Sequence, residues 1–214
     1  MNHKELNRFL TFCSCPDNGI TLLQQRDRLL AAVHTQPTAA AVLVGFAPNA
    51  DGVWHILLTR RADSLRRHSG QTAFPGGKCD PSDADAAATA LREAEEEVGT
   101  PRALWTVSGS LPACRTPSGF RIRPVLATAA AQMPLAAQAA EVAETFWLPL
   151  DLAFNPSAYQ TRTLTWQGQT HATPSLPYRH HDIWGATALI LYHLAACFQA
   201  WQSGSAFDSV PPIG

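Results

Sequence analysis

The chain has 214 residues, of which 46% are hydrophobic, with 16 basic and 17 acidic side chains. This length and composition suffice for one sizeable core, so we expect a single globular domain with a few insertions. The balanced charge excludes the basic stripe that duplex nucleic acid or an anionic membrane would require. We therefore expect a small-molecule substrate, no nucleic-acid partner and no membrane partner, while the sequence leaves the oligomeric state open.

The first ten residues have the pattern of an amphipathic helix and lack the apolar stretch of a signal peptide. We expect residues 1–38 to form an N-terminal helical segment and residues 39–214 to form the main domain. The five cysteines are an odd number in a chain too large to need disulfide stapling, which predicts reduced thiols and a cytoplasmic location. The apolar segment 183–201 includes Tyr192, His193 and Gln199, so it favours a buried helix over a membrane span.

Two β-like runs, 39–46 and 53–60, flank a cluster of turn-forming residues and predict a hairpin. An alanine-rich helix is predicted next, capped by Ser82 or Asp83 and ended at Val98 by Gly99.

The rest of the chain predicts three more strands and a last helix, at 104–111, 121–128, 144–148 and 184–202. The segments 133–141 and 155–181 are expected to lie outside the regular layers, and long connections of this kind are often functional. This order of elements predicts an α/β fold, an α/β/α sandwich with a mixed central sheet.

The alanine-rich helix carries a cluster of carboxylates. At 100° per residue, Glu93, Glu96 and Glu97 share one sector beside the buried stripe, whereas Glu95 points away. Like charges at these spacings cost an isolated helix about 0.2–0.5 kcal/mol per pair, so they need solvent or a counter-charge. A solvated acidic face is the alternative, but a hard cation such as Mg²⁺ or Mn²⁺ would supply the counter-charge. Arg92 precedes Glu96 by one turn and can pair with it.

A glycine-containing loop, Phe74-Pro75-Gly76-Gly77-Lys78, precedes this helix. Paired glycines allow the backbone to approach a metal or phosphate without an intervening side chain. Gly76 and Gly77 are therefore candidate substrate-binding residues.

The spacing of the loop and the helix resembles the Nudix box, G-x5-E-x7-R-E-U-x-E-E-x-G-U, where U is aliphatic. Gly77 begins the match, and the segment Arg92-Glu93-Ala94-Glu95-Glu96-Glu97-Val98-Gly99-Thr100 ends it. The chain departs in three places, because Asp83 replaces the first Glu, one extra residue precedes Arg92, and Thr100 replaces an aliphatic residue. The resemblance implies Glu93 and Glu97 as metal ligands, Glu96 as a ligand or part of the base machinery, and the Gly77 carbonyl as a further candidate ligand.

A second pattern is similar to the coenzyme A pyrophosphatase branch of that family, L-L-T-x-R-[SA]-x3-R-x3-G-x3-F-P-G-G. Every fixed position matches, from Leu57 through Arg61, Arg66 and Gly70 to Gly77, and segment 182–188 is also similar. This resemblance implies hydrolysis of coenzyme A to 4′-phosphopantetheine and adenosine 3′,5′-bisphosphate.

Diphosphate hydrolysis requires that phosphate charge be neutralised and that an activated water be placed in line. Glu96 and Glu141 are equally weighted candidates for the general base, and Arg92 is included in the catalytic set. Arg61 and Arg66 are candidate phosphate contacts, since guanidinium groups suit phosphate, although structural salt bridges would explain them equally well. The alternatives are a pyrophosphatase for another nucleoside diphosphate derivative, such as a dinucleotide, nucleotide sugar or oxidised nucleotide, and a non-catalytic nucleotide-binding module.

Overall fold

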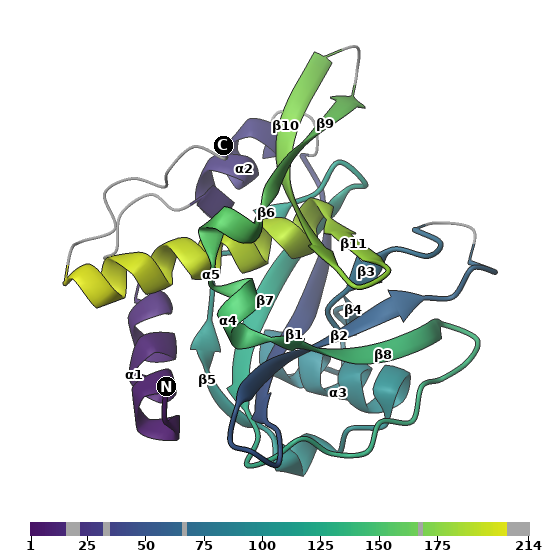
Figure 1. Ribbon diagram of the computed structural model, residues 1–214. Helices are drawn as coiled ribbons and strands as arrows, with labels where there is room; N and C mark the ends of the chain where they lie inside the picture. Colours follow the sequence, from purple (N-terminus) through teal and green to yellow (C-terminus); the bar gives the residue numbers. More distant parts are fainter. Residues whose placement is uncertain (16–21, 32–34, 66–67, 167–168, 205–214) are drawn as a thin grey trace.

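The computed structural model describes residues 1–15, 22–31, 35–65, 68–166 and 169–204. The described residues form an eight-stranded sheet, a separate three-stranded sheet, and helices that cover both faces of the larger sheet (Figure 1). The α/β fold with a mixed central sheet is therefore confirmed.

The central sheet is built around strand β1 (Thr38–Pro48). It forms the predicted antiparallel hairpin with β2 (Trp54–Arg61) and pairs in parallel with β7 (Phe120–Thr128). β5 (Thr106–Ser110) extends the sheet beyond β7, and β8 (Val142–Pro149) pairs with β2. Three short strands complete the sheet, namely β3 (Thr72–Ala73), β4 (Gly76–Lys78) and β6 (Cys114–Arg115).

The two faces of this sheet bury different sets of side chains. Because successive strand residues point to opposite faces, Leu57 joins one apolar cluster and its neighbours Ile56 and Leu58 join the other. The first cluster lies under helix α3, and we call this side the α3 face. The second contains residues of helices α1 and α5, and we call this side the α5 face.

Five α-helices and two short 3₁₀ turns occur among the described residues. α1 (His3–Cys13) begins with a capping box in which Asn2 and Glu5 exchange hydrogen bonds. The others are α2 (Leu22–Ala31), α3 (Ala86–Val98), α4 (Leu150–Ala153) and α5 (Gly185–Ser203), with the 3₁₀ turns at Arg102–Leu104 and Pro156–Ala158. Within the described ranges, no helix has the length and hydropathy needed to cross a membrane.

The start of helix α3 differs from the sequence prediction. Asp85 caps the helix by accepting a hydrogen bond from the Ala88 amide, so the expected cap at Ser82 or Asp83 is wrong. Asp83 has a different contact, because Arg92 and Thr89 both donate hydrogen bonds to it. The end at Val98 is confirmed, and Gly99 adopts the left-handed conformation with φ of 70°.

Segment 155–181 was expected to lie outside the regular layers, and it takes no part in the eight-stranded sheet, but it forms regular structure of its own. It contains β9 (Gln160–Trp166) and β10 (Gln169–Tyr178), which pair antiparallel and project from the body of the molecule (Figure 1). β11 (His181–Trp184) joins the other edge of β10 and leads into α5. Segment 133–141 forms neither a helix nor a strand, as predicted.

Candidate active site

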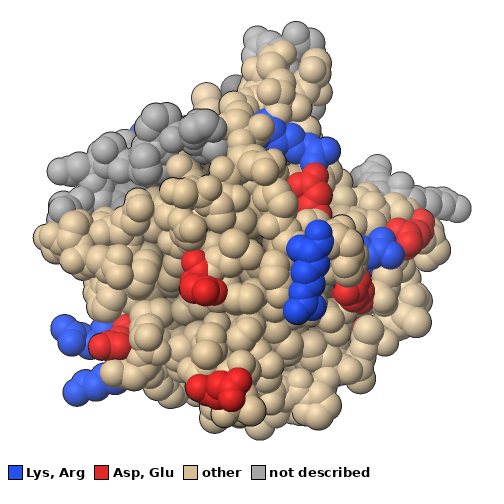
Figure 2. Space-filling view, in the orientation of Figure 1, with Lys and Arg blue, Asp and Glu red and all other residues tan. Residues whose placement is uncertain are grey.

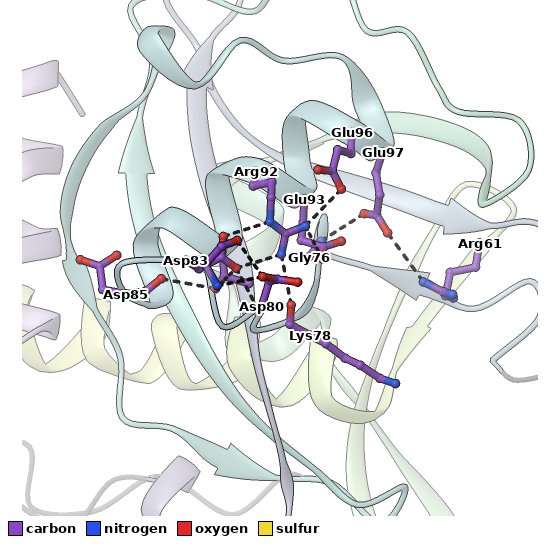
Figure 3. A network of polar contacts seen from close by, with 12 residues as sticks. Arg61, Gly76, Lys78, Asp80, Asp83, Asp85, Arg92, Glu93, Glu96 and Glu97 are labelled. Atoms are coloured by element: carbon purple, nitrogen blue, oxygen red, sulfur yellow. Dashed lines mark hydrogen bonds and ion pairs between the residues drawn. The ribbon is translucent and has the colours of Figure 1, made fainter.

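The candidate site lies on the α3 face, where helix α3 meets residues 74–85, which include β4 with Gly76 and Gly77 and which we call the glycine loop. Figure 3 shows Arg92 in the middle of this region, between Asp83 on the loop and the carboxylates of Glu93 and Glu96. Glu97 points to the other side, towards Arg61.

Arg92 connects the loop to the helix. Its Nε and Nη2 atoms donate to the two carboxylate oxygens of Asp83 at 3.0 and 2.9 Å, and Nη2 also donates to the Lys78 carbonyl at 3.2 Å. Its Nη1 atom donates to Glu93 at 2.9 Å and to Glu96 at 3.1 Å. The predicted pairing of Arg92 with Glu96 is confirmed, and the guanidinium fixes the positions of two acidic side chains relative to the glycine loop.

Asp83 stands where the Nudix box has its first glutamate. A shorter carboxylate still reaches Arg92, with two parallel hydrogen bonds. These bonds hold the pKa of Asp83 well below its usual range. The substitution therefore keeps the salt bridge that joins the loop to the helix.

Glu97 is the most buried carboxylate of the site, with 6% of its side chain exposed. Its Oε2 accepts a hydrogen bond from the Gly76 amide at 3.1 Å, and its Oε1 lies 3.9 Å from Arg61 Nη1. Burial raises the pKa of Glu97 to about 7, and the negative charges of Glu93 and Glu141 act in the same direction. The two favourable contacts therefore only partly offset the removal of this carboxylate from water.

Glu93 lies directly against Gly77. A Cβ atom added to Gly77 would approach the Glu93 carboxylate to 2.5 Å, so no side chain can be accommodated there without moving Glu93. Burial also raises the pKa of Glu93, although the ion pair with Arg92 opposes this shift. The glycine thus leaves space in which a carboxylate approaches the loop backbone.

The two candidate bases lie at the edge of this cluster. The Glu96 side chain is 58% exposed, in contrast to the buried Glu97 one residue later. Glu141 is also exposed, and its backbone carbonyl accepts a hydrogen bond from the Ala62 amide. Its charge contributes to the raised pKa of both Glu93 and Glu97, which places it near the cluster.

Of the two predicted arginines, the structure brings Arg61 to the site. Its side chain is 28% exposed, and its buried Nε has no hydrogen-bond partner among the described residues. Arg66 lies outside the described residues. Arg121, a further cation on the neighbouring strand β7, instead pairs with Asp27 of α2, together with Arg115.

The donor set fits a hard divalent cation. Glu93 presents its oxygen atoms beside Gly77 and Glu97 beside the Gly76 amide, and both carboxylates have raised pKa values because Arg92 and Arg61 do not fully offset their burial. Carboxylate and carbonyl oxygens are the ligands that Mg²⁺ and Mn²⁺ prefer. The residues present can therefore hold such an ion.

The comparisons with known proteins agree with this arrangement. The NUDIX domain model matches residues 35–166. The "Uncharacterized Nudix hydrolase NudL" of Yersinia pestis (strain Pestoides F) is 38% identical over 190 residues, which cover 89% of this chain and 91% of that protein. The chain belongs to the Nudix family. As a Nudix hydrolase, it acts on a substrate that contains a diphosphate linkage.

Two solved structures are also similar. A NUDIX hydrolase from Alicyclobacillus acidocaldarius is 22% identical with a TM-score of 0.47, covering 80% of this chain and 98% of that one. A MutT/nudix family protein from Enterococcus faecalis is 16% identical with a TM-score of 0.49, covering 94% of this chain and 75% of that one.

Proposed function

We propose that this Nudix hydrolase cleaves the diphosphate linkage of coenzyme A or its derivatives, using Mg²⁺ or Mn²⁺, in the cytoplasm. The products are 4′-phosphopantetheine and adenosine 3′,5′-bisphosphate. The observation that carries the proposal is that Glu93, Glu97 and Arg61 converge beside the glycine loop. Of these three residues, Arg61 belongs to the pattern that resembles the coenzyme A pyrophosphatase branch, whereas Glu93 and Glu97 belong to the Nudix box.

In this proposal, Glu93 and Glu97 hold the metal, with Glu96 as a further ligand. The bound ion supplies charge neutralisation for the phosphates and polarises the water that attacks. Arg92 is a positioning residue, because its donors hold Glu93 and Glu96 and join them to the loop through Asp83. Gly76 and Gly77 let this segment lie directly against β1 and the Glu93 carboxylate, and their backbone is proposed to contact the substrate.

Arg61 supplies a cationic contact for the substrate. Its side chain is 28% exposed and its distance of 3.9 Å from Glu97 is long for an ion pair, so we infer that its exposed guanidinium nitrogens are available to phosphate oxygens. Arg66 is proposed as a second contact on the resemblance alone. One diphosphate flanked by a metal needs few cationic donors, which leaves an arginine available for the 3′-phosphate of coenzyme A.

The general base is one of two carboxylates. Glu96 is on α3 and is tethered to Arg92 at 3.1 Å, whereas Glu141 approaches the cluster from the segment before β8. Both are exposed, so both are accessible to the water that has to lose a proton.

A substrate panel tests the proposal. Coenzyme A, acyl derivatives, dinucleotides, nucleotide sugars and nucleoside triphosphates are each incubated with Mg²⁺ or Mn²⁺, with a chelator as the blank, and products are identified by mass spectrometry. We expect the highest kcat/KM for a coenzyme A compound and the two products named above. A higher kcat/KM for a dinucleotide or a nucleotide sugar would reject the coenzyme A assignment, while metal-dependent cleavage of any diphosphate would retain the broader family activity.

A further inference from the structure

A second group of metal-ligating side chains lies on the α5 face of the sheet, away from the carboxylates of α3. Glu144 of β8, His180 of the turn before β11 and His181 of β11 each place one potential ligand atom within 4.8 Å of the other two. Glu144 faces the α5 side because the alternate residues Phe146 and Leu148 belong to the apolar cluster of that face, whereas Trp147 packs against the α3 cluster.

The hairpin turn brings the two histidines together. Tyr178 pairs with His181 across β10 and β11, and Arg179 has the left-handed backbone (φ 55°) that a tight two-residue connection requires. The imidazole of His181 stacks on Phe146 with ring centroids 3.9 Å apart, and the His180 ring lies 4.0 Å from that of His181. The positions of the rings are therefore set by packing on β8.

His181 is a buried polar side chain without a conventional partner. Its side chain is 1% exposed, and neither ring nitrogen makes a hydrogen bond to any residue that the structure describes. Leaving both nitrogens of a buried imidazole unpaired is unfavourable. Its Nε2 lies 3.5 Å from Glu144 Oε1, and the Nε2 of His180 lies 2.9 Å from Glu144 Oε2.

The 3.5 Å separation of His181 and Glu144 suits a tetrahedral ion, whereas the 2.9 Å separation of His180 and Glu144 is a hydrogen-bond distance that would lengthen when an ion binds. With metal bonds of about 2.0–2.2 Å to nitrogen and oxygen, neighbouring ligand atoms in a tetrahedron are separated by about 3.3–3.5 Å. A hydrogen bond from His180 to Glu144 explains one contact of the group, but it leaves His181 with only the long 3.5 Å contact to Glu144 and with no described partner for its Nδ1. A metal ion would provide a partner for all three side chains.

We propose that Glu144, His180 and His181 form a binding site for Zn²⁺ or a similar first-row transition metal, separate from the Mg²⁺ or Mn²⁺ site on α3. Two imidazoles and one carboxylate are ligands that zinc accepts, with a fourth position left to water or another ligand. The nearby cation Arg60 is held by Asp63 through two hydrogen bonds.

Zinc titration of the whole protein tests the site, with excess Mg²⁺ present to compete at the α3 carboxylates. We expect the wild-type protein and Glu97→Gln to bind one equivalent of Zn²⁺. His180→Ala and Glu144→Gln should bind it at least about tenfold more weakly, a loss typical of disrupted metal coordination. His180 is exposed, so its replacement should leave folding intact, and His3→Ala is a matched control for the loss of an exposed histidine.

Cobalt provides a spectroscopic check on the ligands. We expect Co²⁺ in the same site to give visible bands of tetrahedral nitrogen and oxygen coordination, without the ultraviolet band of cobalt–thiolate bonds. Wild-type affinity in both His180→Ala and Glu144→Gln would overturn the proposal. A thiolate band or the absence of Zn²⁺ binding in excess Mg²⁺ would also overturn it.

Discussion

The acidic groups on the two faces of the sheet are assembled in different ways. On the α3 face, Glu93, Glu96 and Glu97 come from adjacent turns of one helix, and a single arginine orients two of them. On the α5 face, Glu144 and His180 are 36 residues apart and meet because β8 and the β10–β11 turn pack together. A local motif therefore identifies the first group, whereas the second is visible only after folding.

The charge environments differ as well. On the α3 face, burial raises the pKa of Glu93 and of Glu97. On the α5 face, the hydrogen bond from His180 lowers the pKa of Glu144. The first group gathers carboxylates whose mutual repulsion an added cation would offset, whereas the second combines one carboxylate with two imidazole rings. Figure 2 shows one side of the whole molecule, where the basic and acidic side chains of the described residues lie in small groups and neither sign of charge dominates.

The largest expected effect comes from Glu97→Gln. Loss of this carboxylate removes a proposed metal ligand, so we expect kcat to fall by at least about 100-fold, as for loss of other electrostatic contributors to a transition state. The glutamine can still accept the Gly76 hydrogen bond, and zinc binding on the α5 face should persist.

The matched control is Glu95→Gln on the same helix. Glu95 is exposed and pairs with Arg102 at 2.7 Å, away from the cluster. Steady-state kinetics at saturating Mg²⁺ should show near-normal turnover for this variant. Near-normal turnover of Glu97→Gln under the same conditions would mean that Glu97 is not a metal ligand.

Gly77→Ala should have the next largest effect. The added Cβ would lie 2.5 Å from the Glu93 carboxylate, so Glu93 would have to move away from the loop. We expect a loss of about 10–100-fold in metal affinity or activity, as when other groups that orient metal ligands are disturbed. Measuring kcat as a function of Mg²⁺ concentration will separate a loss of metal affinity from a loss of activity at saturating metal.

The control for this substitution is Gly52→Ala. Gly52 has φ of 77° and open space around it, so alanine there is strained without disturbing the site. If Gly77→Ala were as active as Gly52→Ala and the wild type, the close approach of Glu93 to Gly77 would not be needed for activity.

Arg61→Ala tests whether the site on the α3 face binds a substrate phosphate through Arg61 in addition to binding the metal. A charge-assisted hydrogen bond contributes about 1.5–3 kcal/mol, so kcat/KM for coenzyme A should fall by roughly tenfold or more. If Arg61 contacts the 3′-phosphate, the wild type should prefer coenzyme A to dephospho-coenzyme A by a similar factor, and the variant should lose this preference. Equal kcat/KM of the wild type for both substrates would remove the 3′-phosphate from the proposal.

The two candidate bases can be separated by pH profiles. Replacing the base, Glu96 or Glu141, with glutamine should reduce the rate by about 10²–10⁴-fold and remove the acidic limb of the profile. Replacing a metal ligand should raise the Mg²⁺ requirement as well as lower kcat, but it should leave the acidic limb of the profile in place. Full activity in both Glu96→Gln and Glu141→Gln would exclude both residues as the base.

The smallest effect concerns stability of the metal-free protein. Because the pKa of Glu97 is about 7 when folded and about 4.5 otherwise, the folded state binds this proton more tightly. Its contribution to the free energy of unfolding is present below pH 4.5 and is lost as pH rises through 7. Urea unfolding with a chelator should show that the wild type loses about 2–3 kcal/mol more than Glu97→Gln between pH 5 and pH 8. Equal losses would contradict the raised pKa.

Periodicity and spacing predicted the elements that bury a continuous apolar face. The β1–β2 hairpin, helix α3 and helix α5 all appear close to their expected ranges, because each places its apolar side chains at the period of its own backbone. The cap of α3 was misplaced because Asp83 and Asp85 are both suitable, and Arg92, a tertiary partner of Asp83, decides between them.

The missed features depend on contacts distant in sequence. β9 and β10 project from the body and consist largely of polar residues, so they carry no alternation of apolar side chains. The convergence of Glu144, His180 and His181 has no signal in spacing. On the α3 face, the acidic residues could be predicted because the Nudix-box residues 92–100 are contiguous in the sequence. The contact of Arg61 with Glu97 could not be predicted, because it forms only when β2 pairs into the sheet.

The parallel pairing of β1 with β7 has a consequence for how the enzyme folds. Thr38 pairs with Phe120, which follows about 80 residues later, and helix α3 lies in the connection and packs on β1. Contacts between such distant residues form slowly, because a long loop must close before they stabilise the chain. In refolding experiments, catalytic activity should therefore return with the slow phase that docks β7, after α3 has gained its helical signal.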